Sequence, residues 1–213
     1  VVDRDARALE QARAEILPHF PPTSRLVTAI VDLADPSAVG HWFDSCDLAV
    51  AALPRAIHAL GVEAARRAGK PLVDVARPDP ETLARWKAAT PPDSPPIFLG
   101  CGLDPGLTEV LAVHLAETLK TVERVWIGCG GIPEHPEPPL GYRLVFGGRV
   151  VPLRAEPARQ VVDGEWVERP RYGGVETLDF TGVGRVEAYD EGVTSWLPEH
   201  PALRGAREIH QKT

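Results

Sequence analysis

The stretch Val1-Val2-Asp3-Arg4-Asp5 decides the fold expected for the first half of the chain. Two β-branched residues run into a carboxylate, a pattern typical of the end of a buried strand. Apolar residues then recur at helical spacing as far as about Leu17. A strand that passes through an acid into a helix predicts the start of a repeating β-α arrangement.

The same alternation continues through the first hundred residues. Further strands are predicted at four short, mainly apolar stretches: Leu26–Val31, Leu48–Ala52, Leu72–Val75, which contains Asp74, and Ile97–Leu99. Helices are predicted between them: Pro36–Phe43 with Asp35 as its cap, Pro54–Ala68 with Gly69 at its end, and Pro80–Ala89. Strands that alternate with helices predict βαβ units and a Rossmann-type parallel sheet.

The pattern changes at Gly100. A glycine loop leads into an amphipathic helix whose apolar stripe is Leu107, Val110, Leu111, Leu115 and Leu119. Four strand-like stretches follow without long helices: Val125–Gly128, Tyr142–Phe146, Val175–Phe180 and Arg185–Tyr189. We therefore expect two domains, 1–100 and 101–213, the second an α+β domain with a mixed or antiparallel sheet and no closing element at Gln211–Thr213.

Composition excludes some classes of partner. The formal net charge of −7 disfavours nucleic acid and anionic membranes, which need clustered positive charge. Three cysteines without a CxxC pattern indicate a reducing compartment. There is no apolar run of membrane-spanning length and no basic-plus-apolar leader, so we expect a cytoplasmic protein without a membrane partner.

The carboxyl ends of the predicted strands suggest a dinucleotide site, because ligands of doubly wound sheets lie there. Asp3 would accept hydrogen bonds from ribose hydroxyls, and Asp32-Leu33 would flank the adenine. Ala52-Leu53-Pro54 would let a flat cofactor approach the backbone. The Asp3 carboxylate favours NAD, whereas Arg4 could attract the 2′-phosphate of NADP. The alternative is that acids after strands are ordinary turn and cap residues.

No GxGxxG turn precedes Asp3, although such a turn normally lies about 20 residues before this acid. We therefore expect the Rossmann-type sheet to lack its first strand in the chain as given, which would begin inside its own cofactor site.

Two segments of the second half are candidates for substrate chemistry. In Gly100–Gly106, Asp104-Pro105 has the pattern of a helix cap followed by proline at the first helical position. Asp104 would also face a cleft if this loop joins the domains. Further on, Tyr142 could donate a proton and Arg143 could bind a carboxylate, although adjacent strand residues point to opposite faces. His58 is expected to be an ordinary helix residue, and no spacing indicates a metal site.

Two of these segments resemble the saccharopine dehydrogenase-like family, and within it the lysine 6-dehydrogenase branch. They are CGLDPGLTEVLA at Cys101–Ala112 and GGIPEHPEPPLGYRLVF at Gly130–Phe146. The first half matches the same family at Ala51–Pro54 and Leu72–Val75. The resemblance implies a Rossmann domain, a catalytic domain with a mixed sheet, a homodimer and an NAD cofactor, with NADP not excluded.

The implied reaction is hydride transfer from the carbon that bears a lysine-type amine, which gives the semialdehyde after hydrolysis. The resemblance places the cofactor at Asp3, Asp32 and Ala52–Pro54, and places four residues near a small amino-acid substrate: Asp74, Asp104, Tyr142 and Arg143. The sequence leaves two alternatives open. One is a saccharopine- or carboxynorspermidine-type reductase of the same family, and the other is a non-catalytic cofactor-binding protein.

Overall fold

The computed structural model describes residues 1–21, 24–54, 56–138, 141 and 154–213. The chain forms two compact units, Val1–Leu99 and Gly100–Thr213. Each unit has its own hydrophobic core and is described by itself below.

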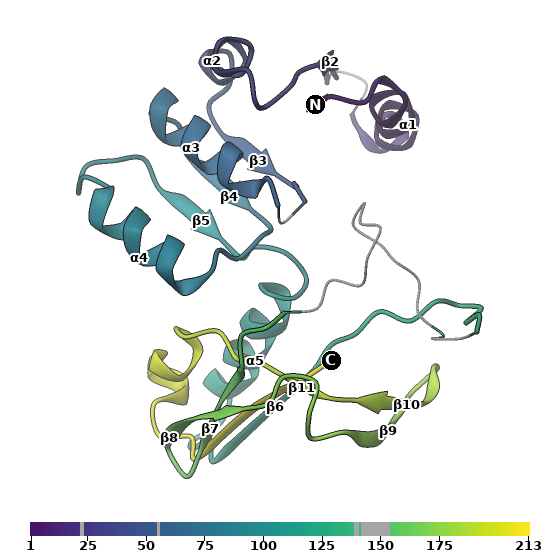
Figure 1. The fold of residues 1–213 in the computed structure, drawn as a ribbon, viewed down its shortest axis with the longest axis vertical. Coiled ribbons are helices and arrows are strands. Elements are labelled where there is room, and N and C mark those ends of the chain that lie inside the picture. The colour runs from purple at the N-terminus through teal and green to yellow at the C-terminus, as the bar shows by residue number, and fades with distance from the viewer. Residues whose placement is uncertain (22–23, 55, 139–140, 142–153) are drawn as a thin grey trace. The chain divides into compact units, whose positions relative to one another are not determined.

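The first unit alternates strands and helices, as predicted (Figure 1). Its strands are β1 (Val2–Asp3), β2 (Ala29–Ile30), β3 (Ala49–Ala51), β4 (Leu72–Asp74) and β5 (Ile97–Leu99). Its helices are α1 (Ala6–Ile16), α2 (Pro36–Asp44), α3 (His58–Ala68) and α4 (Pro80–Ala89), with a 3₁₀ turn at Leu17–His19. Strands β1 and β2 are parallel, and β3, β4 and β5 form a second parallel sheet in that order. The predicted parallel α/β class is confirmed.

Short-range signals explain where these helices begin and end. The Asp35 side chain accepts hydrogen bonds from the backbone of Ser37 and Ala38, so the predicted cap of α2 is confirmed. Gly69 ends α3 in the left-handed conformation, at φ 62°. The start of α3 was predicted wrongly at Pro54. Ile57 N–H donates to Pro54 O at 2.9 Å, and the helix begins at His58.

In the described part of the second unit there is one α-helix, together with a mixed sheet. Helix α5 (Leu107–Glu117) comes first, and the strands follow: β6 (Arg124–Gly128), β7 (Ala158–Val162), β8 (Glu165–Arg169), β9 (Glu176–Phe180), β10 (Gly184–Ala188), β11 (Asp190–Glu191) and β12 (Glu208–Lys212). Two 3₁₀ turns, Leu197–Glu199 and Pro201–Leu203, precede β12. Strands β9 and β10 form a separate antiparallel hairpin. The mixed sheet confirms the α+β class predicted for this half.

Strand β12 pairs with three of the other four strands of the five-stranded sheet. It pairs in parallel with β6 and antiparallel with β7 and β11. The expectation of no closing element at Gln211–Thr213 is therefore wrong. The error has a physical cause: four of the five residues of β12 are polar, and the strand is buried because partners distant in sequence satisfy them.

Ion pairs of two buried carboxylates stabilise the sheet at β11. The Glu191 carboxylate lies between the guanidinium groups of Arg154 and Arg171. Next to it, Asp190 bonds to Lys212 Nζ at 2.9 Å and to Gln160 Nε2 at 3.1 Å. Burial alone would raise the pKa of the Asp190 carboxyl, but the hydrogen bonds from Lys212 and Gln160 and the charge of Lys212 lower it below its ordinary value.

Helix α5 has the predicted apolar periodicity, but the structure leaves the stripe uncovered. Leu107, Val110, Leu111 and Leu115 are about half exposed or more. The face of α5 that packs inward carries Glu109 and Ala116 instead. Among the described residues, no helix has both the length and the apolar character required to cross a membrane.

Candidate functional site

The two acids predicted to hold a ribose and an adenine lie at the ends of neighbouring parallel strands. Asp3 is in register with Ile30, and Asp32 follows two residues later. Both carboxylates are exposed, and each uses Oδ1 to accept a backbone N–H two residues on, from Asp5 at 2.8 Å and from Ala34 at 2.9 Å. These are the turns that the ordinary interpretation of such acids expects, and they leave both side chains at the surface.

The carboxyl ends of β3, β4 and β5 are aligned, because Ala51 pairs with Asp74 and Asp74 pairs with Leu99. Ala52-Leu53-Pro54 continues from β3 at this edge, with Ala52 and Pro54 exposed and Leu53 half-buried. Arg4 is exposed beside Asp3, and Leu33 is half-buried beside Asp32. The structure thus places the predicted cofactor residues in two strand-end groups within the first unit.

Asp74 is fully buried, with 0% of its surface exposed. Its Oδ1 accepts a hydrogen bond from Ala76 N at 2.9 Å, and its Oδ2 lies 3.3 Å from Nδ1 of His58. His58 is 7% exposed and meets the Trp86 ring edge-on, with centroids 6.0 Å apart. His58 lies on a helix, as expected, but its buried pairing with Asp74 was not part of the prediction. The pairing joins residues 16 positions apart, and no local pattern marks it.

The Gly100–Gly106 loop is held by its own backbone. Gly102 N donates to Pro105 O at 2.9 Å, and Leu107 N donates to Gly102 O at 2.9 Å. Asp104 was predicted as the cap of α5, and this is wrong, because the helix begins at Leu107 with Gly106 as its cap residue. Glu109 does the capping instead: its Oε2 accepts from Gly106 N at 2.6 Å. The Asp104–Pro105 peptide is cis.

Asp104 is instead joined to the last strand. Its Oδ1 accepts a hydrogen bond from Gln211 Nε2 at 2.6 Å, across 107 positions of sequence. We call Asp104, Glu109 and Gln211 the acid–amide cluster. Cys129 lies beside it: burial raises the pKa of the Cys129 thiol, and the negative charges of Asp104 and Glu109 raise it further. Sequence reasoning did not identify Glu109 or Gln211 as members of a site.

The other two predicted substrate residues, Tyr142 and Arg143, lie outside the described residues. Within the described ranges, no group of three histidine, cysteine or acidic side chains is arranged to hold a metal ion.

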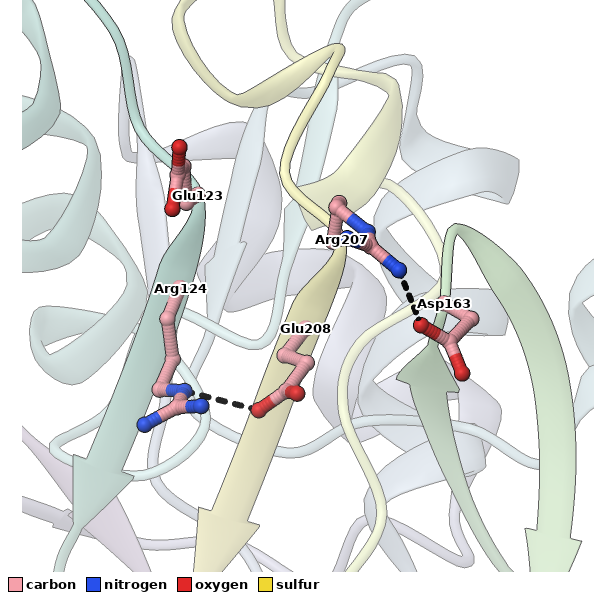
Figure 2. A pocket seen from close by; sticks show the side chains of 5 residues that line it. All are labelled: Glu123, Arg124, Asp163, Arg207 and Glu208. Atoms are coloured by element: carbon pink, nitrogen blue, oxygen red, sulfur yellow. Dashed lines mark hydrogen bonds and ion pairs between the residues drawn. The ribbon is translucent and has the colours of Figure 1, made fainter.

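A hollow of about 360 Å³ lies elsewhere on the second unit and is lined by charged side chains only: Glu123, Arg124, Asp163, Arg207 and Glu208 (Figure 2). Two ion pairs account for four of them, Arg124–Glu208 at 2.7 Å and Arg207–Asp163 at 2.5 Å. The hollow lies where β6 and β12 begin, whereas the acid–amide cluster lies where they end. Because these pairs are solvated and already matched, we do not assign a ligand to this hollow.

The geometry defines the class of the chain: an α/β protein with parallel strands in one unit and a mixed sheet in the other. No known family model matches the chain. The apo structure of histidine-tagged saccharopine dehydrogenase (L-Glu forming) from Saccharomyces cerevisiae is similar to it, with a TM-score of 0.66 and 18% identity. The match covers all of this chain and 48% of that one, so the chain spans about half the length of its structural neighbour. The chain therefore has a saccharopine dehydrogenase-like fold.

Proposed function

We propose that this protein is an NAD(P)-dependent oxidoreductase that acts on the CH–NH group of an amino acid. The observation that carries the proposal is the alignment of Asp3 and Asp32 on neighbouring parallel strands, in a fold similar to that of an amino-acid dehydrogenase. The exposed Asp3 carboxylate fits ribose hydroxyls, the exposed Asp32 fits a position beside the adenine, and the small exposed Ala52 fits close approach of a flat ring. A bound nicotinamide would supply the hydride acceptor.

The substrate we favour is L-lysine, oxidised at its ε-carbon. The C–H bond breaks as a hydride leaves, the nitrogen loses a proton, and a C=N bond forms. Water then adds to this imine and releases ammonium and the semialdehyde. In this proposal the protein orients the amine: Asp104 accepts from it, Tyr142 handles a proton, Arg143 binds the α-carboxylate, and buried Asp74 shapes the site.

A second candidate is a saccharopine-type dehydrogenase, favoured by the similarity to the saccharopine dehydrogenase structure. Both candidates share the hydride step and differ in the nitrogen substituent. The test is nicotinamide reduction measured separately with L-lysine and with saccharopine, using NAD and NADP in turn. Turnover of lysine alone supports the first candidate, and turnover of saccharopine alone supports the second. A rise in melting temperature with cofactor but no turnover of any amine would indicate a non-catalytic cofactor-binding protein.

We also propose that two copies associate through the exposed stripe of α5. The stripe consists of Leu107, Val110, Leu111, Leu115 and Leu119, and Leu103 in the loop before the helix is exposed as well. Together they expose on the order of 600 Å² per copy, so two copies would bury about 1,200 Å², the lower limit of specific interfaces. Light scattering tests this: Leu111→Glu with Leu115→Glu should convert a dimer into a monomer. A wild-type monomer would refute the proposal.

A further inference from the structure

Two buried side-chain oxygens of the acid–amide cluster have no hydrogen-bond partner among the described residues: Glu109 Oε1 and Gln211 Oε1. Glu109 is 0% exposed and Gln211 is 1% exposed. Native proteins satisfy nearly all buried polar atoms, and leaving one unpaired is costly. Gln211 bonds to Asp104, and the charges of Asp104 and Glu109 both act on the Cys129 thiol, so the two unpaired acceptors belong to one region of the unit and indicate that a donor belongs there.

The amide orientation of Gln211 strengthens this conclusion. Its Nε2 donates to the Asp104 carboxylate at 2.6 Å. The reversed orientation would place the amide oxygen against that carboxylate, where two acceptors would repel each other. The hydrogen bond thus fixes which Gln211 atom is the oxygen, and that oxygen is the unpaired one.

Helix capping accounts for only one of the two carboxylate oxygens of Glu109. Its Oε2 accepts from Gly106 N at 2.6 Å and from Thr108 Oγ1 at 2.8 Å. Neither bond uses Oε1, and no described lysine, arginine or histidine forms an ion pair with Glu109. A buried carboxylate without a cation favours binding of one. Lys212, next to Gln211, is engaged by Asp190, Glu176 and Gly174 O.

We propose that the acid–amide cluster is a subsite for a primary ammonium group. An ammonium has three N–H donors, a positive charge and no acceptor, which complements the unpaired Glu109 carboxylate oxygen and the unpaired Gln211 amide oxygen. A ligand could reach the cluster from the side of Asp104, because Asp104 is only half-buried and its neighbour Leu103 is exposed to solvent. This deepens the proposed function by assigning the amine end of an amino-acid substrate to Glu109 and Gln211 as well as to Asp104.

The first test is nuclear magnetic resonance of the wild-type full chain, read at the side-chain NH₂ of Gln211 and assigned by its loss in Gln211→Met. Butylammonium chloride is the probe, with sodium chloride and neutral butanol as controls. We expect a saturable shift with butylammonium alone. If butylammonium leaves the Gln211 signal unchanged, the cluster holds only water and the inference is overturned.

L-lysine and L-norleucine, which lacks the ε-amine, separate the subsite from the proposed function. A shift with butylammonium but not with lysine keeps the subsite and refutes the lysine substrate. A shift with butylammonium and with lysine, but none with norleucine, supports both the subsite and the lysine substrate.

The second test uses Glu109→Gln, which keeps the carbonyl oxygen that caps the helix but removes the charge. Its matched control is Glu117→Gln on the exposed end of the same helix. We expect Glu109→Gln to weaken the dissociation constant of butylammonium at least tenfold and Glu117→Gln to leave it unchanged. Equal affinity in the two variants would overturn the inference, even if lysine is turned over.

Discussion

The sharpest prediction concerns Gly106, the residue that turns the Gly100–Gly106 loop into α5. Its φ of 137° lies where side chains are rarely tolerated. A Cβ there would meet Gly102 O well inside contact distance and would lie 2.7 Å from Gly100 O and from Gly102 N. All three are backbone atoms of the same loop, so none can swing aside. Backbone strain alone costs about 1–3 kcal/mol, and the contacts add to it, so we expect Gly106→Ala to lose about 3 kcal/mol or more.

Urea unfolding followed by circular dichroism measures this loss. The control is Gly205→Ala in the same unit, where an added Cβ meets nothing within 4 Å, and we expect it to change stability by less than about 0.5 kcal/mol. For a unit of this size, a loss of about 3 kcal/mol corresponds to a melting temperature lower by roughly 10 °C or more. If Gly106→Ala is as stable as Gly205→Ala, the loop can accept a side chain and the reasoning fails.

Three further predictions concern the charged groups of the second unit. Glu191→Gln should cost about 3 kcal/mol in urea unfolding because it neutralises a buried carboxylate that is paired with both Arg154 and Arg171, whereas Asp163→Asn, in an exposed pair, should cost less than about 1 kcal/mol; equal losses would contradict the buried pairing. Because the folded-state pKa of Asp190 lies below its ordinary value of 3.8, its pairing stabilises the fold above that pH and is lost as pH falls further, so Lys212→Met should be less stable near neutral pH and the difference should shrink in acid; a constant difference in unfolding free energy across pH would refute this. The raised pKa of Cys129 predicts slower alkylation by iodoacetamide at a given pH than that of N-acetylcysteine, and mass spectrometry that finds equal rates would count against it.

The first unit could be predicted from sequence because its signals are local. Its strands are short apolar runs, as at Leu48–Ala52, although Leu48 and Val50 are exposed, and its helices carry caps such as Asp35 and Gly69 within a few residues of their ends. Strand β12 gave no such signal. Its polar residues are buried by partners far along the chain, and periodicity cannot identify such partners.

The same limit applies to the candidate site. The strand-end positions of Asp3 and Asp32 follow from a local pattern, whereas the pairing of His58 with Asp74 requires the packing of α3 against β4. Periodicity predicted the stripe of α5, but not that it would be uncovered while Glu109 faced inward. The Asp104-Pro105 pair resembled a helix start, yet the glycine after it, with its unusual backbone angle, moved the start to Leu107.

Because β12 pairs with three strands of its sheet, it affects how the second unit can fold while the chain is being synthesised. Its partner β6 is made early, and the ion pair between them joins residues 84 positions apart. Until Glu208–Lys212 leaves the ribosome, β6 and β7 lack their shared neighbour, and the acid–amide cluster lacks Gln211. The second unit must therefore wait as an incomplete sheet with open edges, which makes this interval the one in which the nascent chain most needs protection from association.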